Sequence, residues 1–130
     1  MKHRVEGYAT RQYHQPVKRY CQTLDLKQDE ALIARYREVH DKANAWPEIR
    51  QGIREIGILE MEMYIYENKV FMIVETPLDF DWEKAMEKLA TLPRQQEWED
   101  FVADLQGCGK GQASADKWHL MERMFYLYDT

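Results

Sequence analysis

Two short runs of alternating residues most limit what this chain can fold into. They are residues 58–66 (ILEMEMYIY) and residues 70–76 (VFMIVET), and Glu67, Asn68 and Lys69 separate them. Successive side chains of a strand point to opposite faces, and a connection this short joins antiparallel neighbours. The two runs therefore predict a β-hairpin, so the fold must contain a sheet built around it.

The first run has two chemically different faces. One face is apolar and carries Leu59, Met61, Met63 and Ile65. The other face combines carboxylates, phenols and one aliphatic side chain: Ile58, Glu60, Glu62, Tyr64 and Tyr66. A face of this second kind either meets solvent or lines a site.

The segments before the hairpin predict one strand and two helices. Residues 17–26 alternate imperfectly, which favours a strand. Residues 28–40 repeat apolar side chains at helical spacing and predict an amphipathic helix. A second helix follows, because Pro47 suits a first helical position and Gly57 suits a C-terminal cap.

A second pair of helices is predicted after the hairpin. One begins after Asp81, and the other lies between Pro93 and Gly107. Residues 107–116 (GCGKGQASAD) are small, polar and rich in glycine, so they predict a mobile loop. The chain then reaches residues 118–128, whose aromatic content predicts a last strand.

This order of elements is typical of the α+β, ferredoxin-like βαββαβ fold, here with each crossover helix split in two. Right-handed crossovers place all helices on one face of a four-stranded antiparallel sheet and leave the other face open. Because both faces carry apolar side chains, we expect a second copy of the chain to cover the open face. The prediction is a homodimeric α/β barrel, with residues 17–130 as its single domain and residues 1–16 as a flexible arm.

Composition argues against several classes of function. The 130 residues are 45% hydrophobic with a formal charge of −5, which favours one well-packed domain and disfavours a nucleic-acid partner. No apolar run is long enough to span a membrane, and residues 1–16 lack the apolar core of a signal peptide, so no membrane partner is expected. Cys21 and Cys108 form no CxxC pair, which disfavours a disulfide framework or a metal site and favours the cytoplasm.

Tyr36 and His40 are the candidate reactive pair. Their spacing brings an imidazole and a phenol to one helix face, where both can address one small polar substrate. On spacing alone, a structural role at a helix end is favoured over proton transfer. Glu60 and Glu62 can be read as paired catalytic carboxylates or as solvated residues of an edge strand.

Several of these residues belong to one longer pattern. It comprises YREVH at residues 36–40, WPE at 46–48, Gly57 before a strand, QEW at 96–98 and a closing MFYL at 124–127. This pattern resembles the L-rhamnose mutarotase family over about residues 17–128. The family's dimeric ferredoxin-like barrel agrees with the order of elements described above.

The resemblance implies roles for three residues. His40 is the proton donor, the Tyr36 hydroxyl contacts the substrate, and Trp98 forms a wall of the sugar pocket. The chain departs from the family pattern by two extra residues between His40 and Trp46.

Two further departures concern residues that contact the sugar in some family members. Glu99 stands where those members have the second residue of a Trp-Trp pair, and their substrate-contacting strand tyrosine falls on or near Met61. Our hypothesis is that Glu60 or Glu62 supplies hydrogen bonds in place of the missing groups. Glu62 is therefore a candidate substrate-binding residue.

The activity implied by the resemblance is that of an isomerase, a mutarotase that interconverts the α and β anomers of a 6-deoxyhexose. L-Rhamnose is the first substrate to consider and L-fucose the second. Ring opening and closure need an acid and a base, so no redox cofactor or metal is expected. In this hypothesis His40 protonates the ring oxygen, while Tyr36, a carboxylate or water takes the anomeric proton.

Two alternatives share the topology. One is a monooxygenase-like or haem-degrading dimeric barrel, although the polar face with Glu60, Glu62 and Tyr64 suits a haem pocket poorly. The other is a non-catalytic sugar-binding protein, which predicts stabilisation by sugar without anomer exchange.

Overall fold

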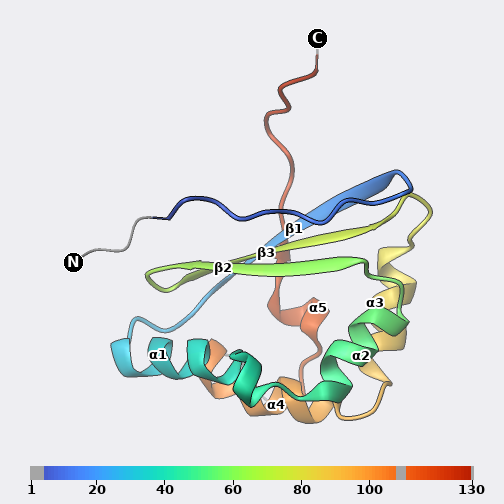
Figure 1. The fold of residues 1–130 in the computed structure, drawn as a ribbon. Helices are drawn as coiled ribbons and strands as arrows, with labels where there is room; N and C mark the ends of the chain where they lie inside the picture. The colour runs from blue at the N-terminus through green and yellow to red at the C-terminus, as the bar shows by residue number, and fades with distance from the viewer. Residues whose placement is uncertain (1–4, 108–110, 130) are drawn as a thin grey trace.

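The computed structural model describes residues 5–107 and 111–129 (Figure 1). Its elements in chain order are β1 (Val17–Asp25), α1 (Glu30–Val39), the 3-10 helix η1 (Lys42–Asn44), α2 (Pro47–Glu55), β2 (Glu60–Tyr66), β3 (Lys69–Pro77), α3 (Trp82–Ala90), α4 (Gln95–Gln106), α5 (Ser114–Lys117) and β4 (His119–Leu120). This order confirms the predicted βαββαβ arrangement and the split of both crossovers.

The four strands form one antiparallel sheet in the order β2-β3-β1-β4. β3 pairs with the whole of β1, from Pro77 opposite Val17 to Lys69 opposite Asp25. The predicted hairpin joins β2 to β3, and its turn places Glu67 at a φ of 54°. The sheet order confirms the ferredoxin-like fold class.

The helices lie on one side of the sheet (Figure 1). The core between the two layers is formed by apolar side chains such as Val74 of β3 and Val102 of α4, both of which are fully buried. Met61 and Met63 of β2 pack against the same core. The apolar face predicted for β2 is therefore the face that the helices cover.

Local sequence explains where the helices begin and turn. The Asp29 and Asp81 carboxylates each accept a hydrogen bond from a backbone N–H in the first turn of α1 and α3, as expected for N-cap residues. After α2 the chain turns sharply at Gly57, which has a φ of 100°. Glycine adopts this conformation readily because it has no Cβ, so the predicted end of the helix is confirmed.

The opposite face of the sheet meets the N-terminal arm. Tyr8 lies edge-on to Tyr64, with ring centroids 5.7 Å apart, and the Tyr13 hydroxyl donates a hydrogen bond of 2.9 Å to Glu75. Burial and the Glu75 carboxylate raise the pKa of Tyr13 to about 12. The described part of the arm is thus held against the sheet, whereas the boundary of the domain at residue 17 stays a prediction.

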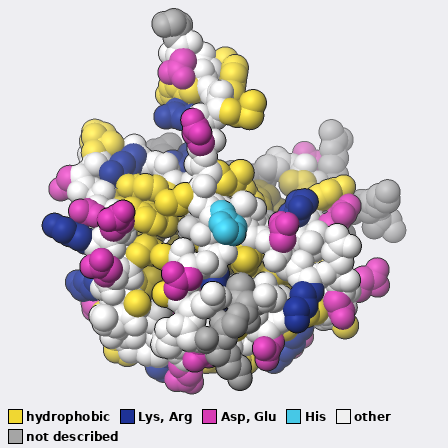
Figure 2. Space-filling view, turned by 180° about the vertical axis from the view of Figure 1, so that it is seen from behind, with side chains coloured by type: hydrophobic (Ala, Val, Ile, Leu, Met, Phe, Trp, Pro, Cys, Tyr) yellow, Lys and Arg dark blue, Asp and Glu magenta, His cyan; other side chains and the backbone are white. Residues whose placement is uncertain are grey.

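The last strand is much shorter than predicted. β4 contains two residues, and the backbone N–H of Met121 still donates to the carbonyl of Cys21 before the chain leaves the sheet. Beyond that point Met124 is 96% exposed and Phe125 is 74% exposed. Figure 2 shows this tail projecting from the body with hydrophobic side chains along it. The predicted strand over residues 118–128 is wrong beyond Leu120, because no strand among the described residues pairs with the tail past that point.

The predicted loop at residues 107–116 is also partly wrong. α5 begins at Ser114, and the Asp116 carboxylate accepts a hydrogen bond from the backbone N–H of Ala113. Asp100 of α4 accepts another from the backbone N–H of Gly111. These carboxylates give the polar backbone of the segment fixed partners, which the glycine content concealed. Residues 108–110 of the predicted loop lie outside the described residues.

Candidate functional site

His40 lies at the C-terminal end of α1, one turn after Tyr36. The backbone N–H of His40 closes the helix by donating to the carbonyls of Arg37 and Glu38. The imidazole folds back so that its Nδ1 lies 2.7 Å from the Tyr36 carbonyl oxygen. The two rings stand 4.4 Å apart, and Tyr36 is only 3% exposed. The structure thus brings the predicted pair together.

The protonation state of His40 follows from these contacts. A carbonyl oxygen can only accept a hydrogen bond, so Nδ1 carries the proton and Nε2 is the acceptor of the neutral ring. Burial lowers the pKa of His40, and the positive charge of Arg50 acts in the same direction, while the bond to the Tyr36 carbonyl opposes them. The imidazole is therefore mainly neutral near pH 7.

An aromatic cluster from three segments surrounds the imidazole. Trp98 of α4 lies edge-on to His40 at 5.3 Å, and Trp46, directly before α2, lies 5.2 Å from Trp98. The Arg94 guanidinium stacks over the Trp46 ring at 4.2 Å and binds Glu48 of α2 at 3.0 Å. These contacts hold Trp46 against Trp98, which in turn lies beside the imidazole.

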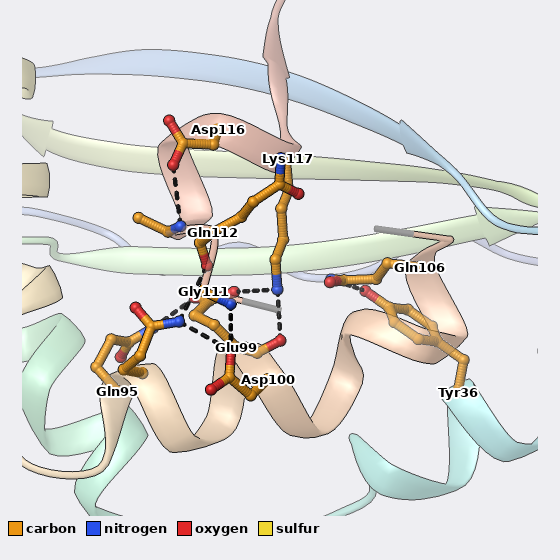
Figure 3. A network of polar contacts seen from close by, with 11 residues as sticks. Tyr36, Gln95, Glu99, Asp100, Gln106, Gly111, Gln112, Asp116 and Lys117 are labelled. Carbon is orange, nitrogen blue, oxygen red and sulfur yellow. Dashed lines mark hydrogen bonds and ion pairs between the residues drawn. The ribbon is translucent and has the colours of Figure 1, made fainter. Parts of the chain in front are cut away.

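The Tyr36 hydroxyl reaches the end of α4. Gln106, in the last turn of α4, donates its amide N–H to that hydroxyl at 3.4 Å. Figure 3 shows the Gln106 amide and the Tyr36 ring meeting on the same side of α4 that faces Lys117. Tyr36 therefore connects the imidazole on α1 to a buried polar region.

The structure does not bring Glu62 to this site. Glu62 pairs with Ile73 in the hairpin, whereas its neighbour Met63 pairs with Met72 in the core, so the sheet separates Glu62 from His40. The Tyr64 hydroxyl donates to Glu62 at 3.0 Å, and this bond raises the pKa of Tyr64. The expectation that Glu62 replaces a missing sugar contact is thus not supported within one chain. The alternation of β2 already placed Glu62 on the face opposite Met61, the face without helices.

Sequence reasoning missed three buried polar residues near Tyr36. Glu99 and Gln106 lie on the sheet-facing side of α4, and Lys117 forms an ion pair with Glu99 at 3.0 Å. The sequence pattern identifies Glu99 as a departure from the family but does not indicate that its carboxylate is buried. The helical spacing of Glu99 and Gln106 was an available signal, but Lys117 lay in and beside a segment predicted to be a loop.

The described part of the chain provides no cluster of three His, Cys, Asp or Glu side chains able to hold a metal ion. Among residues 5–107 and 111–129, no helix has the length and apolar character that crossing a membrane requires.

A family model and several known proteins are similar to this chain. A family model described as L-rhamnose mutarotase matches residues 19–127. An L-fucose mutarotase of Xanthomonas campestris pv. campestris is 32% identical over 114 residues, which cover 88% of this chain and 91% of the relative. The chain belongs to the L-rhamnose mutarotase family. A UPF0734 protein of Dictyostelium discoideum is 33% identical over 90 residues, which cover 68% of this chain and 70% of that protein.

A crystal structure of an L-rhamnose mutarotase from Formosa agariphila has the same fold. Its TM-score is 0.62 at 23% identity, and the match covers 85% of this chain and 98% of that chain. The resemblance predicted for residues 17–128 is therefore confirmed. Mutarotases are isomerases that interconvert sugar anomers, and the family favours this activity over the monooxygenase-like and sugar-binding alternatives.

Proposed function

We propose that this protein is a cytoplasmic, homodimeric mutarotase acting on a 6-deoxyhexose, with L-rhamnose as first candidate and L-fucose as second. The observation that carries the proposal is the half-buried, mainly neutral imidazole of His40. It is held by the Tyr36 carbonyl beside Trp98 in a chain of the mutarotase family.

His40 is the proton-transfer residue in this mechanism. The protonated minority form of the imidazole gives its Nε2 proton to the sugar ring oxygen while a second group removes the anomeric hydroxyl proton, and the C1–O5 bond breaks to give the open-chain aldehyde. Rotation about C1–C2 exposes the other carbonyl face, and the reverse transfers close the ring as the other anomer. A lowered pKa makes the imidazolium a stronger acid than free histidine and leaves a neutral ring able to take the proton back.

Trp98 and Tyr36 are the proposed substrate contacts. The Trp98 ring offers an apolar wall to the C–H groups of the sugar, and the Tyr36 hydroxyl is a hydrogen-bonding group on the other side of the helix end. Glu62 has no part in this proposal because it lies on the other face of the sheet.

The homodimer is supported by what one chain leaves uncovered. Phe71 and Ile73 of β3 are partly exposed on the face away from the helices, and Met124, Phe125 and Leu127 of the tail after β4 are largely exposed. Cytoplasmic location is supported by Cys21, whose free thiol a reducing compartment maintains.

The decisive experiment is saturation-transfer NMR of anomer exchange over a panel of L- and D-hexoses. We expect acceleration for L-rhamnose or L-fucose and little for D-glucose. No acceleration for any sugar, with sugar-dependent thermal stabilisation, would instead indicate a binding protein. An absorbance change on titration with haem would favour the monooxygenase-like alternative.

A further inference from the structure

Arg94 has an unfavourable backbone conformation at the start of α4. It is the N-cap residue of this helix, with a φ of 63° and a ψ of 4°, and its side chain makes no capping hydrogen bond. In the described part of the chain, Glu67 in the hairpin turn is the other non-glycine residue with a positive φ. A left-handed conformation is unfavourable for a residue with a Cβ, so glycine would suit this position better. The contacts of the Arg94 side chain therefore have to explain its presence.

The Arg94 guanidinium connects the start of α4 to α2 and to the segment before α2. Its Nε and Nη2 donate to the two carboxylate oxygens of Glu97 at 3.2 and 2.9 Å, and its Nη1 donates to Glu48 of α2 at 3.0 Å. The same planar group lies over the Trp46 ring, with its central carbon 4.2 Å from the ring centroid. An arginine that binds both oxygens of one carboxylate has a fixed orientation. The guanidinium is therefore a rigid support for the Trp46 indole.

Stability alone does not explain this arrangement. The side chains of Arg94 and Glu97 are 41% and 58% exposed, and exposed ion pairs contribute little to the free energy of unfolding. The left-handed backbone acts against that small contribution. Strained conformations that persist without a gain in stability are typical of functional sites.

Trp46 depends on its side-chain contacts for its position. It follows the exposed residues 41–44, and as N-cap residue of α2 it makes no side-chain capping hydrogen bond. One contact of its ring is the Arg94 guanidinium, and another is Trp98 at 5.2 Å. Trp98 then meets the His40 imidazole edge-on at 5.3 Å, with an angle of 83° between the ring planes. A single indole thus links Arg94 to the proposed wall of the sugar pocket.

We propose that Arg94 is a positioning residue for sugar binding, which acts through Trp46 to hold Trp98 in the orientation that forms the pocket wall beside His40. The inference rests on the proposed mutarotase function. The Trp98 wall contacts the C–H groups of the sugar, whereas His40 transfers the proton. A wall that contacts the ground state and the transition state equally lowers KM and leaves kcat unchanged.

The test is Arg94→Gly, which removes the guanidinium and suits the left-handed backbone. Saturation-transfer NMR at a series of sugar concentrations gives KM and kcat separately. We expect KM for the accelerated sugar to rise about fivefold or more, with kcat within about twofold of the wild type, because only binding is weakened. The free energy of unfolding should change little, since relief of the backbone offsets the loss of exposed ion pairs. The matched control is Lys69→Met, which removes an exposed ion pair with Asp25 and should leave KM unchanged.

A second variant tests whether the effect passes through Trp46. Trp46→Leu alone should raise KM, and adding Arg94→Gly to it should raise KM no further, because the guanidinium then has no ring to support. If the two effects on KM multiply instead, Arg94 acts by another route and the inference is overturned.

An unchanged KM in Arg94→Gly, with or without a fall in kcat, also overturns the inference, while the activity of the wild type upholds the proposed function. Failure of Arg94→Gly to fold, or a clear loss of its stability, overturns it too, because the role of Arg94 is then structural. A wild type that accelerates no sugar overturns both the inference and the proposed function.

Discussion

His40 acquires its properties from its position at a helix end. The carbonyl of Tyr36 in α1 fixes the tautomer by accepting the hydrogen bond from Nδ1, and the Trp98 ring lies against the imidazole. The same imidazole on an exposed helix surface would titrate near its ordinary pKa and adopt either tautomer. A single backbone contact together with burial therefore prepares Nε2 for proton transfer.

Replacing His40 by alanine should abolish catalysis and leave the fold intact. We expect anomer exchange to fall by roughly 10²–10⁴-fold, toward the spontaneous rate, because positioned acid–base groups contribute that much. Saturation-transfer NMR measures the rate, and circular dichroism confirms the fold. The control is His14→Ala, since His14 is exposed in the N-terminal arm, and it should retain activity. Full activity of His40→Ala would contradict the assignment of His40 as the proton-transfer residue.

The lowered pKa of His40 also predicts how stability depends on pH. The folded-state pKa lies below the ordinary value of 6.5, so between the two values the unfolded chain binds more protons than the folded chain. The free energy of unfolding should therefore decrease as pH falls below about 6.5, and His40 should contribute no pH dependence well above it.

Urea unfolding of the wild type and of His40→Ala between pH 5 and pH 8 measures this contribution. We expect the wild type to lose more stability on acidification than the variant. If the free energy of unfolding falls equally with pH in the two proteins, protonation of His40 does not destabilise the fold.

At the scale of elements, the most demanding junction is the turn from α2 into β2. Gly57 adopts a φ of 100° there, and a Cβ at this position would lie 3.6 Å from the Phe80 ring. The space is adequate, so the constraint comes from the backbone conformation. This turn leads into β2, which lies at the edge of the sheet opposite β4.

Gly57→Ala should destabilise the protein by about 1–2 kcal/mol, the usual penalty for an L-residue in a left-handed conformation. The matched control is Gly52→Ala, inside α2, where a Cβ would lie 3.4 Å from a flexible Leu92 methyl group and the helix itself favours alanine. Chemical denaturation gives both values. Equal effects of the two substitutions would argue against backbone strain at Gly57.

At the scale of the whole molecule, the two faces of the sheet are covered differently. The helices cover one face, while the other meets the arm through Tyr8 and Tyr13 and leaves Phe71 and Ile73 partly exposed. The hydrophobic tail leaves the body beyond β4 (Figures 1 and 2). A second copy packed on the open face would bury these apolar groups, which is the physical argument for the homodimer.

Ile73→Lys should separate the dimer into single chains, because it places a charge in the middle of the open face. Size-exclusion chromatography with light scattering should give two chains per particle for the wild type and one for the variant. The control is Leu78→Lys, a residue 57% exposed in the turn after β3, which should remain dimeric. A wild type that is monomeric at all concentrations would contradict the proposed assembly.

The sequence by itself determined the hairpin, the split crossovers, the ferredoxin-like class and the face of α1 shared by Tyr36 and His40. These features depend on periodicity and capping between residues close in the chain, which a single sequence records directly. The alternation of β2 correctly placed Glu62 on the face opposite Met61, and a role of Glu62 in substrate binding stays a prediction.

Only the tertiary structure decided which polar residues are buried and where the tail goes. Gln106 meets Tyr36 and Lys117 meets Glu99 across different elements, and no local pattern encodes such pairings. The aromatic tail has the composition of a strand, yet a strand forms only where a neighbouring backbone offers hydrogen bonds. Contacts between segments distant in sequence depend on the packing of the whole chain. Such packing placed the Glu99–Lys117 pair between α4 and α5, and α4 contacts the helix α1 that carries His40 at its end.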